Sequence, residues 1–126
     1  MPKEILGKTV LPAPYNQGTK VGNTIHIAGQ IGIDEKGKLA EGGIKAETRQ
    51  VMENIKAVVE AGGGMMDDIM STTVFVTNWE RDYAGYNEVY AEYFTEGQEP
   101  ARASMHIKGL ALGALIEIMA VAMLSD

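Results

Sequence analysis

One segment near the C-terminus restricts the possible folds more than any other. Residues 114–124 read ALIEIMAVAML, in which ten of eleven residues are apolar and the remaining one is Glu117. Side chains alternate along a strand, so both faces of this expected strand are apolar. Such a strand is predicted to be covered on both sides. A lone buried carboxylate is costly, so Glu117 must meet a positive charge, hydrogen-bond donors or a water-filled pocket.

The remaining patterns predict an α+β fold. Residues 44–61 place apolar side chains along one helical stripe, and residues 79–94 repeat aromatic residues at three- and four-residue spacings. An irregular or extended segment is expected at 11–23, and strands are expected at 24–33, 68–78, 101–107 and from about 114. We therefore expect one domain, residues 1–126, with a mixed sheet of about six strands covered on one face by two helices.

Several motifs have a structural interpretation. The run Gly62-Gly63-Gly64 follows a predicted helix and is typical of left-handed C-cap positions. The aromatic stripe of residues 79–94 predicts packing in a core or an interface. His26 and His106 lie on separate predicted strands without further ligands nearby in sequence, whereas a metal ion needs three or four convergent ligands. No metal site is therefore expected.

Charge and composition exclude some function classes. The formal net charge is −6, from 11 basic and 17 acidic residues, and the basic residues are scattered. Nucleic-acid binding is therefore disfavoured, because it depends on clustered lysines and arginines. The chain has no cysteine, so disulfides and thiolate chemistry are excluded. Neither a signal peptide nor a membrane span is visible, and a cytoplasmic protein is expected.

The polar residues of the last two predicted strands can be interpreted in two ways, as a structural ion pair or as a catalytic site. Arg102 begins a predicted strand just after Pro100, and Ser104 and His106 follow on the same face. If this strand adjoins the last one, Arg102 is the obvious cation for Glu117. Spacing alone supports a structural ion pair and a catalytic site equally.

Seven segments, in order along nearly the whole chain, resemble the RidA family, which is also called the YjgF family. The combination of PYNQG, PAR and the IEI strand carries most of this resemblance. The segments are APYNQG (13–18), IAGQIGID (27–34), TRQVMENIKAVVEAGG (48–63), STTVFVTN (71–78), YNEVYAEYF (86–94), EPARAS (99–104) and LGALIEIMAVA (112–122). The resemblance implies a chorismate-mutase-like α+β fold. It also implies a homotrimer with ligand pockets between subunits.

The resemblance implies roles for individual residues. Arg102 matches the arginine that binds the substrate carboxylate, a task that suits a guanidinium because it binds carboxylates bidentately. Glu117 matches the pocket glutamate that positions or activates the attacking water. Tyr15 matches a tyrosine that lines the pocket, Asn87 matches the asparagine of the YNEVY segment, and Gly29 matches a position whose backbone faces the ligand.

The reaction implied by the resemblance is hydrolysis of a reactive enamine or imine to a 2-keto acid and ammonia. The expected substrates are 2-aminoacrylate and its 2-iminopropanoate tautomer, as for a 2-iminobutanoate/2-iminopropanoate deaminase. Arg102 would hold the carboxylate while a water near Glu117 attacks the imine carbon. This chemistry requires no cofactor and no metal. The expected partners are a small imino or keto acid and further copies of the chain.

The sequence also departs from the family pattern. Ala28 stands where many members have serine, and Ser104 stands where many of the deaminases have cysteine. Both positions are expected to lie at the pocket, and Ser104 is expected to contact substrate. Ala111 replaces a proline and Met119 replaces a second glutamate of the common last strand. The first two differences affect the expected substrate preference.

Three alternatives to this deaminase stay open. The first is a non-catalytic trimer that binds a small carboxylate and has a regulatory role, because Arg102 would serve both functions. The second is a related hydrolysis of another enamine. The third is an endoribonuclease or translation inhibitor, an activity attributed to some relatives. The negative net charge and the absence of a paired histidine site count against this third alternative.

Overall fold

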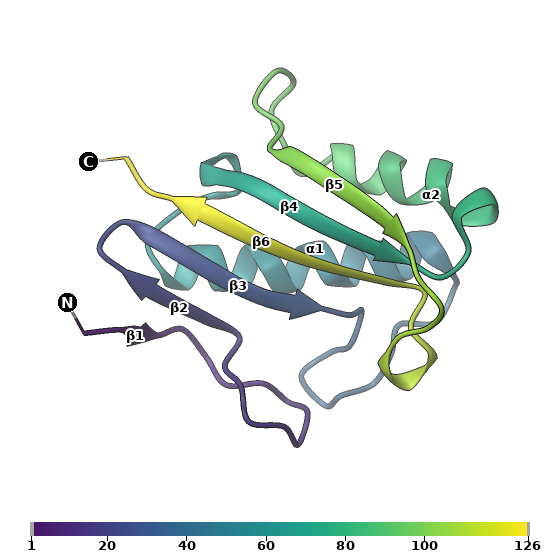
Figure 1. Ribbon diagram of the computed structural model, residues 1–126, viewed down its shortest axis with the longest axis horizontal. Helices are drawn as coiled ribbons and strands as arrows, with labels where there is room; N and C mark the ends of the chain where they lie inside the picture. The colour runs from purple at the N-terminus through teal and green to yellow at the C-terminus, as the bar shows by residue number, and fades with distance from the viewer. Residues whose placement is uncertain (1, 126) are drawn as a thin grey trace.

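The computed structural model describes residues 2–125, which form a six-stranded sheet with two helices (Figure 1). The order across the sheet is β1-β2-β3-β6-β4-β5, in which β4 and β5 are parallel and the other neighbours are antiparallel. The predicted mixed sheet is confirmed. Its strands are β1 (Glu4–Ile5), β2 (Gly18–Val21), β3 (Thr24–Gln30), β4 (Ile69–Val76), β5 (Ala101–His106) and β6 (Ile116–Met123).

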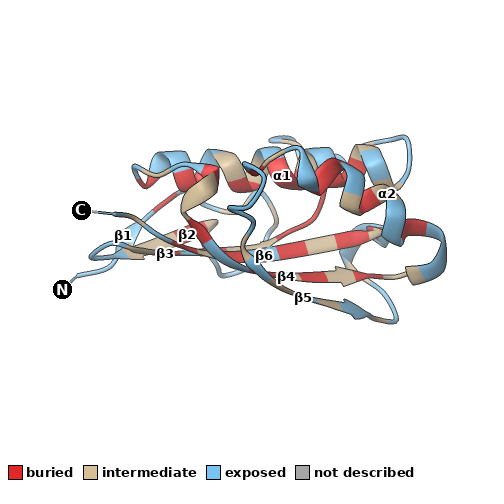
Figure 2. Ribbon diagram, turned by 90° about the horizontal axis from the view of Figure 1, so that it is seen from above, coloured by how far each residue is buried: buried red, intermediate tan, exposed pale blue. Residues whose placement is uncertain are grey.

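Both helices, α1 (Ile44–Ala61) and α2 (Trp79–Ala91), lie on the same face of the sheet, as predicted (Figure 2). Two short 3-10 helices, η1 (Met66–Asp68) and η2 (Ala111–Gly113), precede β4 and β6. Along α1 the apolar stripe is buried against the sheet, because its side chains recur on one side of the helix. The buried apolar residues of α1 are Val51, Met52, Ile55, Val58 and Val59.

Helix α2 is shorter than the sequence pattern indicates. It begins after Asn78, whose side-chain Oδ1 accepts a hydrogen bond from the backbone N–H of Arg81 at 3.1 Å, as an N-cap does. It ends at Ala91 rather than at residue 94. The aromatic stripe nevertheless packs as expected, although Tyr83 is exposed and stacks on Trp79. Its buried members are Tyr86, Tyr90 and Phe94.

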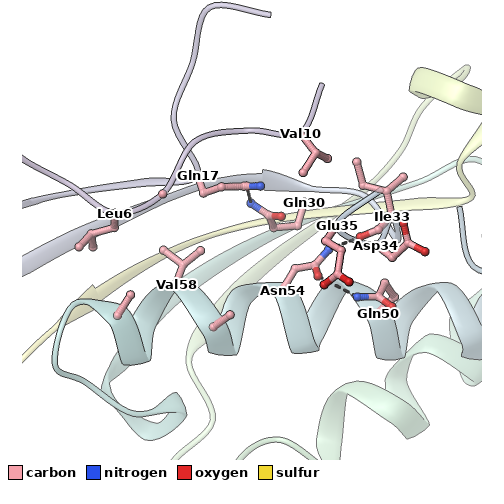
Figure 3. Close-up of a pocket in the computed structure, with 13 residues that line it drawn as sticks. Leu6, Val10, Gln17, Gln30, Ile33, Asp34, Glu35, Gln50, Asn54 and Val58 are labelled. Atoms are coloured by element: carbon pink, nitrogen blue, oxygen red, sulfur yellow. Dashed lines mark hydrogen bonds between the residues drawn. The ribbon is translucent and has the colours of Figure 1, made fainter. Parts of the chain in front are cut away.

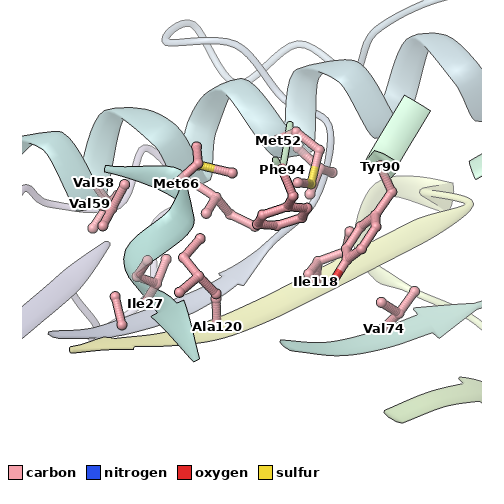
Figure 4. Packing of buried hydrophobic residues seen from close by; sticks show 14 of the residues in the cluster. Ile27, Met52, Val58, Val59, Met66, Val74, Tyr90, Phe94, Ile118 and Ala120 are labelled. Carbon is pink, nitrogen blue, oxygen red and sulfur yellow. The ribbon is translucent and has the colours of Figure 1, made fainter. Parts of the chain in front are cut away.

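The hydrophobic core fills the space between the helices and one face of the sheet. Figure 4 shows Met52, Val58 and Val59 of α1 across the core from Ile118 and Ala120 of β6. Met66, Tyr90 and Phe94 fill the remaining space. Burying a large apolar side chain contributes about 1.5–3 kcal/mol, so this layer is the main source of stability.

The central strand β6 is covered on one face within a single chain. Its helix-facing side chains are buried, whereas Met119 is 41% exposed and Met123 is 51% exposed on the other face. The expectation that both faces are covered is therefore wrong for the isolated chain. Both helices cross the same side, so no element of residues 2–125 covers the opposite one.

The N-terminal part contains strands that the sequence pattern did not separate. Residues 18–21 form β2, which pairs with β3 through a tight turn in which Gly22 has φ of 59°. β3 ends at Gln30 rather than at residue 33, and its pairing with β6 shifts register between Ile27 and Gln30. No helix within residues 2–125 is long and apolar enough to cross a membrane.

The three glycines after α1 have different roles. Only Gly63 has left-handed backbone geometry, with φ of 93°, whereas Gly62 is right-handed. A Cβ on Gly62 would collide with the side chain of Ile25, and one on Gly64 would lie 2.5 Å from Leu124. The prediction of left-handed C-cap geometry is thus confirmed for one of the three positions. The other two allow close packing of the chain.

Candidate functional site

Arg102 lies on the edge strand β5 and projects toward the helices. It pairs with Thr72 of β4, which is buried under α2, and paired residues project from the same face of a sheet. Its Nη1 donates a hydrogen bond to Oδ1 of Asn87 at 2.7 Å. Its Cζ lies 5.3 Å from the ring centroid of Tyr86 and 5.0 Å from that of Tyr90, within the range of cation–π contacts. The guanidinium therefore has a fixed position.

Hydrogen bonds also fix the two aromatic rings. The hydroxyl of Tyr86 lies 2.8 Å from Oγ of Ser104, and the hydroxyl of Tyr90 lies 2.7 Å from Oγ1 of Thr72. Burial raises the pKa of both tyrosines, so both phenols stay neutral and act as hydrogen-bonding groups. The structure thus brings together three residues selected from the sequence. We call the group Arg102, Asn87, Ser104, Tyr86 and Tyr90 the arginine half-site.

Glu117 projects from the open face of β6. It is partly buried, and it has no hydrogen-bond or ion-pair partner among residues 2–125. Burial raises the pKa of the Glu117 carboxyl. Gly29 of β3 is its neighbour, since a Cβ on Gly29 would lie only 2.7 Å from Oε2 of Glu117. We call Glu117 and Gly29 the glutamate half-site.

The two half-sites lie on opposite faces of the same sheet. Strand β4 separates β5 from β6, so Arg102 and Glu117 are not on adjoining strands. Arg102 shares the helix-facing side with Thr72, whereas Glu117 pairs with Phe75 on the alternate side. The ion pair between Arg102 and Glu117 that spacing allowed is therefore absent within one chain. Nor can one copy place both side chains on a single small substrate.

Tyr15 lies apart from both groups of residues. It belongs to the loop before β2, near the sheet edge opposite to β5, and it is 39% exposed. Its phenol has no hydrogen-bond partner in the described part of the chain, residues 2–125. The fold of one copy therefore does not bring Tyr15 to the arginine half-site.

The histidines do not form a site with each other. His26 is exposed on β3, and Nε2 of His106 lies 3.3 Å from the backbone oxygen of Thr77 at the far edge of the sheet. Among residues 2–125 there is no cluster of three histidine, aspartate or glutamate side chains that could hold a metal ion.

Two buried carboxylates were missed from the sequence. Glu47 of α1 is only 4% exposed, and its Oε1 accepts the backbone N–H of Leu115 at 2.8 Å. Burial raises the pKa of Glu47, and the negative charge of Asp82 adds to this effect. Asp82 is itself buried and is held bidentately by Arg81. The sequence did contain a signal for the burial of Glu47. Position 47 lies four residues before 51 and eight before 55, so it continues the apolar stripe of the helix.

Known proteins resemble this chain in both sequence and fold. The model of the family described as Endoribonuclease L-PSP matches residues 8–124. A RutC family protein of Pyrococcus horikoshii is 49% identical over 110 residues, which are 86% of each chain. RidA from an Antarctic Psychrobacter species is 38% identical, with a TM-score of 0.86 over 94% of each chain.

The structure of the YjgF gene product of E. coli is also similar to this chain. It is 35% identical, with a TM-score of 0.88, over 97% of this chain and 99% of that one. Sequence, family model and fold thus agree over almost the whole length of the protein. The chain belongs to the Endoribonuclease L-PSP family, the group that contains the RidA, YjgF and RutC proteins.

Proposed function

We propose that this protein hydrolyses reactive enamines and imines of the 2-aminoacrylate and 2-iminopropanoate type to 2-keto acids and ammonia. The observation that carries the proposal is the state of Arg102. Its guanidinium is held by Asn87 and two tyrosine rings, yet no carboxylate of residues 2–125 neutralises it. A guanidinium has five N–H donors, and one hydrogen bond to Asn87 leaves donors for a substrate carboxylate.

Glu117 is suited to activate water. Its carboxyl has a raised pKa because of burial, and a base with a pKa closer to the working pH accepts a proton more readily. Its lack of a partner among residues 2–125 leaves its oxygens free for a water molecule. The open position beside it is maintained by Gly29, which adds no side chain there.

One active site then needs two copies of the chain. Arg102 and Glu117 lie on opposite faces of the sheet, so one substrate reaches both only if each comes from a different subunit. The open face of β6, with Met119 and Met123 exposed, supplies apolar surface for such an assembly. We propose a homotrimer in which the open sheet faces pack inward, with three pockets between subunits. Light scattering that gives a stable monomer at micromolar concentration would contradict this assembly.

The proposed reaction needs only water as co-reactant. An enamine first tautomerises to the imine, and the arginine half-site binds the carboxylate of that imine. The oxygen of a water beside Glu117 attacks the imine carbon, and the carboxylate accepts one water proton. The imine nitrogen gains protons and leaves as ammonia when the C=O bond forms. Water and imine are thus converted to one 2-keto acid and one ammonia.

The test is release of keto acid from a freshly generated imine. A pyridoxal-phosphate dehydratase acting on serine supplies 2-aminoacrylate in the assay, and pyruvate formation is followed at several concentrations of the protein. We expect the rate to rise in proportion to protein concentration above the spontaneous background. Pyruvate binding without any increase in rate would instead support the non-catalytic regulatory alternative. Imines with longer side chains, compared in the same assay, would rank substrate preference around Ser104.

A ribonuclease is the second candidate, because the matching family model carries that description. Hydrolysis of RNA usually relies on paired acid and base groups, and the two histidines lie on different strands without contact. A preparation freed of trace nucleases decides the matter. Cleavage of RNA that disappears in the Glu117→Gln variant would favour the nuclease over the deaminase.

A further inference from the structure

A cavity separate from both half-sites lies between α1 and the N-terminal strands (Figure 3). Its volume of about 480 Å³ is within the range of small-molecule pockets. All its walls come from one copy of the chain, so it does not depend on the proposed trimer. Its apolar lining consists of Leu6, Val10, Ile33, Ala57, Val58 and Ala61.

A buried amide directs an unpaired oxygen at this cavity. Gln30 is only 4% exposed, and its Nε2 donates to the backbone oxygen of Ala28 at 3.1 Å and to Oε1 of Gln17 at 2.7 Å. A backbone oxygen can only accept, so the orientation of the Gln30 amide is fixed. Its Oε1 then has no partner among residues 2–125. The one fully enclosed unpaired polar side-chain atom in that range is Oγ1 of Thr48, so Oε1 of Gln30 keeps access to the cavity.

A second amide pair repeats this arrangement. Nδ2 of Asn54 donates to the backbone oxygens of Ile31 and Ile33 at 3.3 and 2.9 Å, which fixes the orientation of Asn54. Its Oδ1 accepts from Nε2 of Gln50 at 2.8 Å. Oε1 of Gln50 is therefore a further free acceptor within the described part of the chain.

The charges around the cavity are negative. Asp34 and Glu35 belong to its lining, and no lysine or arginine does. Oδ1 of Asp34 accepts the backbone N–H groups of Lys36 and Lys38, so this carboxylate is fixed in place and keeps its negative charge beside the exposed Glu35. Two free amide oxygens and a carboxylate suit a cation with several N–H donors, and they disfavour an anion.

We propose that this cavity binds a small organic amine. In the view of Figure 3, Leu6 and Val58 lie at one end, the Gln50–Asn54 pair and Glu35 lie toward the other, and Gln30 lies between them. The apolar body of the amine packs toward Leu6 and Val58. Its ammonium group donates to the free oxygens of Gln30 and Gln50 and faces the Glu35 carboxylate. This site excludes the carboxylate ligands expected at Arg102.

Three probes with the same apolar body test this specificity. 2-Phenylethylamine, 2-phenylethanol and 3-phenylpropanoate are titrated into the assembled protein while its backbone amide NMR signals are recorded. We expect 2-phenylethylamine to shift signals of the cavity residues saturably, and its affinity to exceed that of the anion by at least about tenfold, a difference of about 1.4 kcal/mol. Pyruvate should not displace it. Equal binding of amine and anion, or no saturable amine binding, would overturn the proposal.

Two variant pairs locate the binding. Ala57→Phe fills the cavity from α1, whereas Ala84→Phe makes the same change at an exposed position of α2 outside it. Glu35→Gln removes the charge at the cavity, whereas Glu41→Gln removes an exposed charge elsewhere. We expect the first member of each pair to weaken amine binding by about tenfold, and the control to change it by less than about twofold. Amine affinity that is unchanged in Ala57→Phe would place the ligand elsewhere and overturn the site.

Discussion

Arg102 differs from the other two arginines in what it contacts. Arg49 pairs with Glu92 and Arg81 pairs with Asp82, whereas Arg102 donates to a neutral amide and lies over two rings. Arg102 is only half-buried, so its remaining N–H groups are open to water or to a ligand. The geometry thus favours a binding role over a structural one. The sequence left both the binding role and the structural role of Arg102 open, because residue spacing does not reveal which strands adjoin.

The first prediction concerns the shape of this cation. Arg102→Lys keeps the charge but loses the planar fork that binds both carboxylate oxygens. We expect pyruvate, as a stable product, to bind about tenfold to a hundredfold more weakly, which corresponds to about 1.5–3 kcal/mol. Isothermal titration measures the change, with Arg49→Lys as the surface control. Unchanged pyruvate affinity in Arg102→Lys would mean that Arg102 has a structural role.

The second prediction separates catalysis from binding. Glu117→Gln keeps the size of the side chain but removes the base, so pyruvate binding should be retained. Turnover of 2-iminopropanoate should fall by about 10²–10⁴, the usual contribution of general acid–base catalysis. Glu60→Gln on α1 is the matched control. A well-folded Glu117→Gln variant with full turnover would remove Glu117 from the mechanism.

The third prediction concerns the space that Gly29 leaves. A Cβ at this position would lie 2.7 Å from Oε2 and 2.9 Å from Cδ of Glu117, so the carboxyl must move. We expect Gly29→Ala to fold but to lose turnover by about tenfold to a hundredfold, as small displacements of catalytic groups do. Gly109→Ala is the control, since no atom lies within 4 Å of a Cβ there. Equal turnover in both variants would show that the position of Glu117 is not critical.

At the scale of elements, local patterns predicted α1 well and the ends of strands poorly. The stripe of α1 has the helical period, and its bounds agree with the prediction of 44–61. The register shift after Ile27 and the early end of α2 depend on contacts between distant segments, which periodicity does not contain. Glu47 shows the same limit. It reads as a first-turn acidic residue, but it joins α1 to Leu115 just before β6.

The fourth prediction uses the raised pKa of Glu47. In the unfolded chain its pKa is near 4.5, and burial raises it in the folded protein. The folded state therefore binds this proton more tightly, and stability falls as pH rises from about 4.5 through the folded pKa. Glu47→Gln has no such proton to lose but keeps an oxygen that accepts from Leu115. We expect its melting temperature, relative to that of the wild type, to rise between pH 4 and pH 7.

Thermal unfolding followed by circular dichroism at several pH values measures this difference. Glu60→Gln is exposed on the same helix and controls for the change in net charge. Glu47→Ala removes the acceptor as well and should cost about 1–3 kcal/mol at every pH, because the part-buried N–H of Leu115 then loses this partner. A difference between Glu47→Gln and wild type that does not depend on pH would contradict the assignment.

At the scale of the whole molecule, the sequence indicated candidate residues for a site but not their arrangement. Two apolar faces on residues 114–124 indicated that β6 needs more cover than one chain provides. In the single chain Met119 and Met123 stay exposed, so cover from a further copy stays a prediction. The division of the site into two half-sites was not predicted. It follows from β4 inserting between β5 and β6, and from the register that places Arg102 and Glu117 on alternate faces, neither of which residue spacing encodes.

The last prediction tests this division directly. If Arg102 and Glu117 act from different subunits, a chain with Arg102→Lys and a chain with Glu117→Gln each keep the residue that the other lacks. Mixed trimers then contain interfaces in which both residues are intact. Random mixing of equal amounts in a cyclic trimer gives such interfaces about a quarter of the time. We expect co-refolded mixtures to recover about a quarter of wild-type turnover, although each parent has almost none. A mixture no more active than its parents, despite verified subunit exchange, would show that the two residues do not share an active site across subunits.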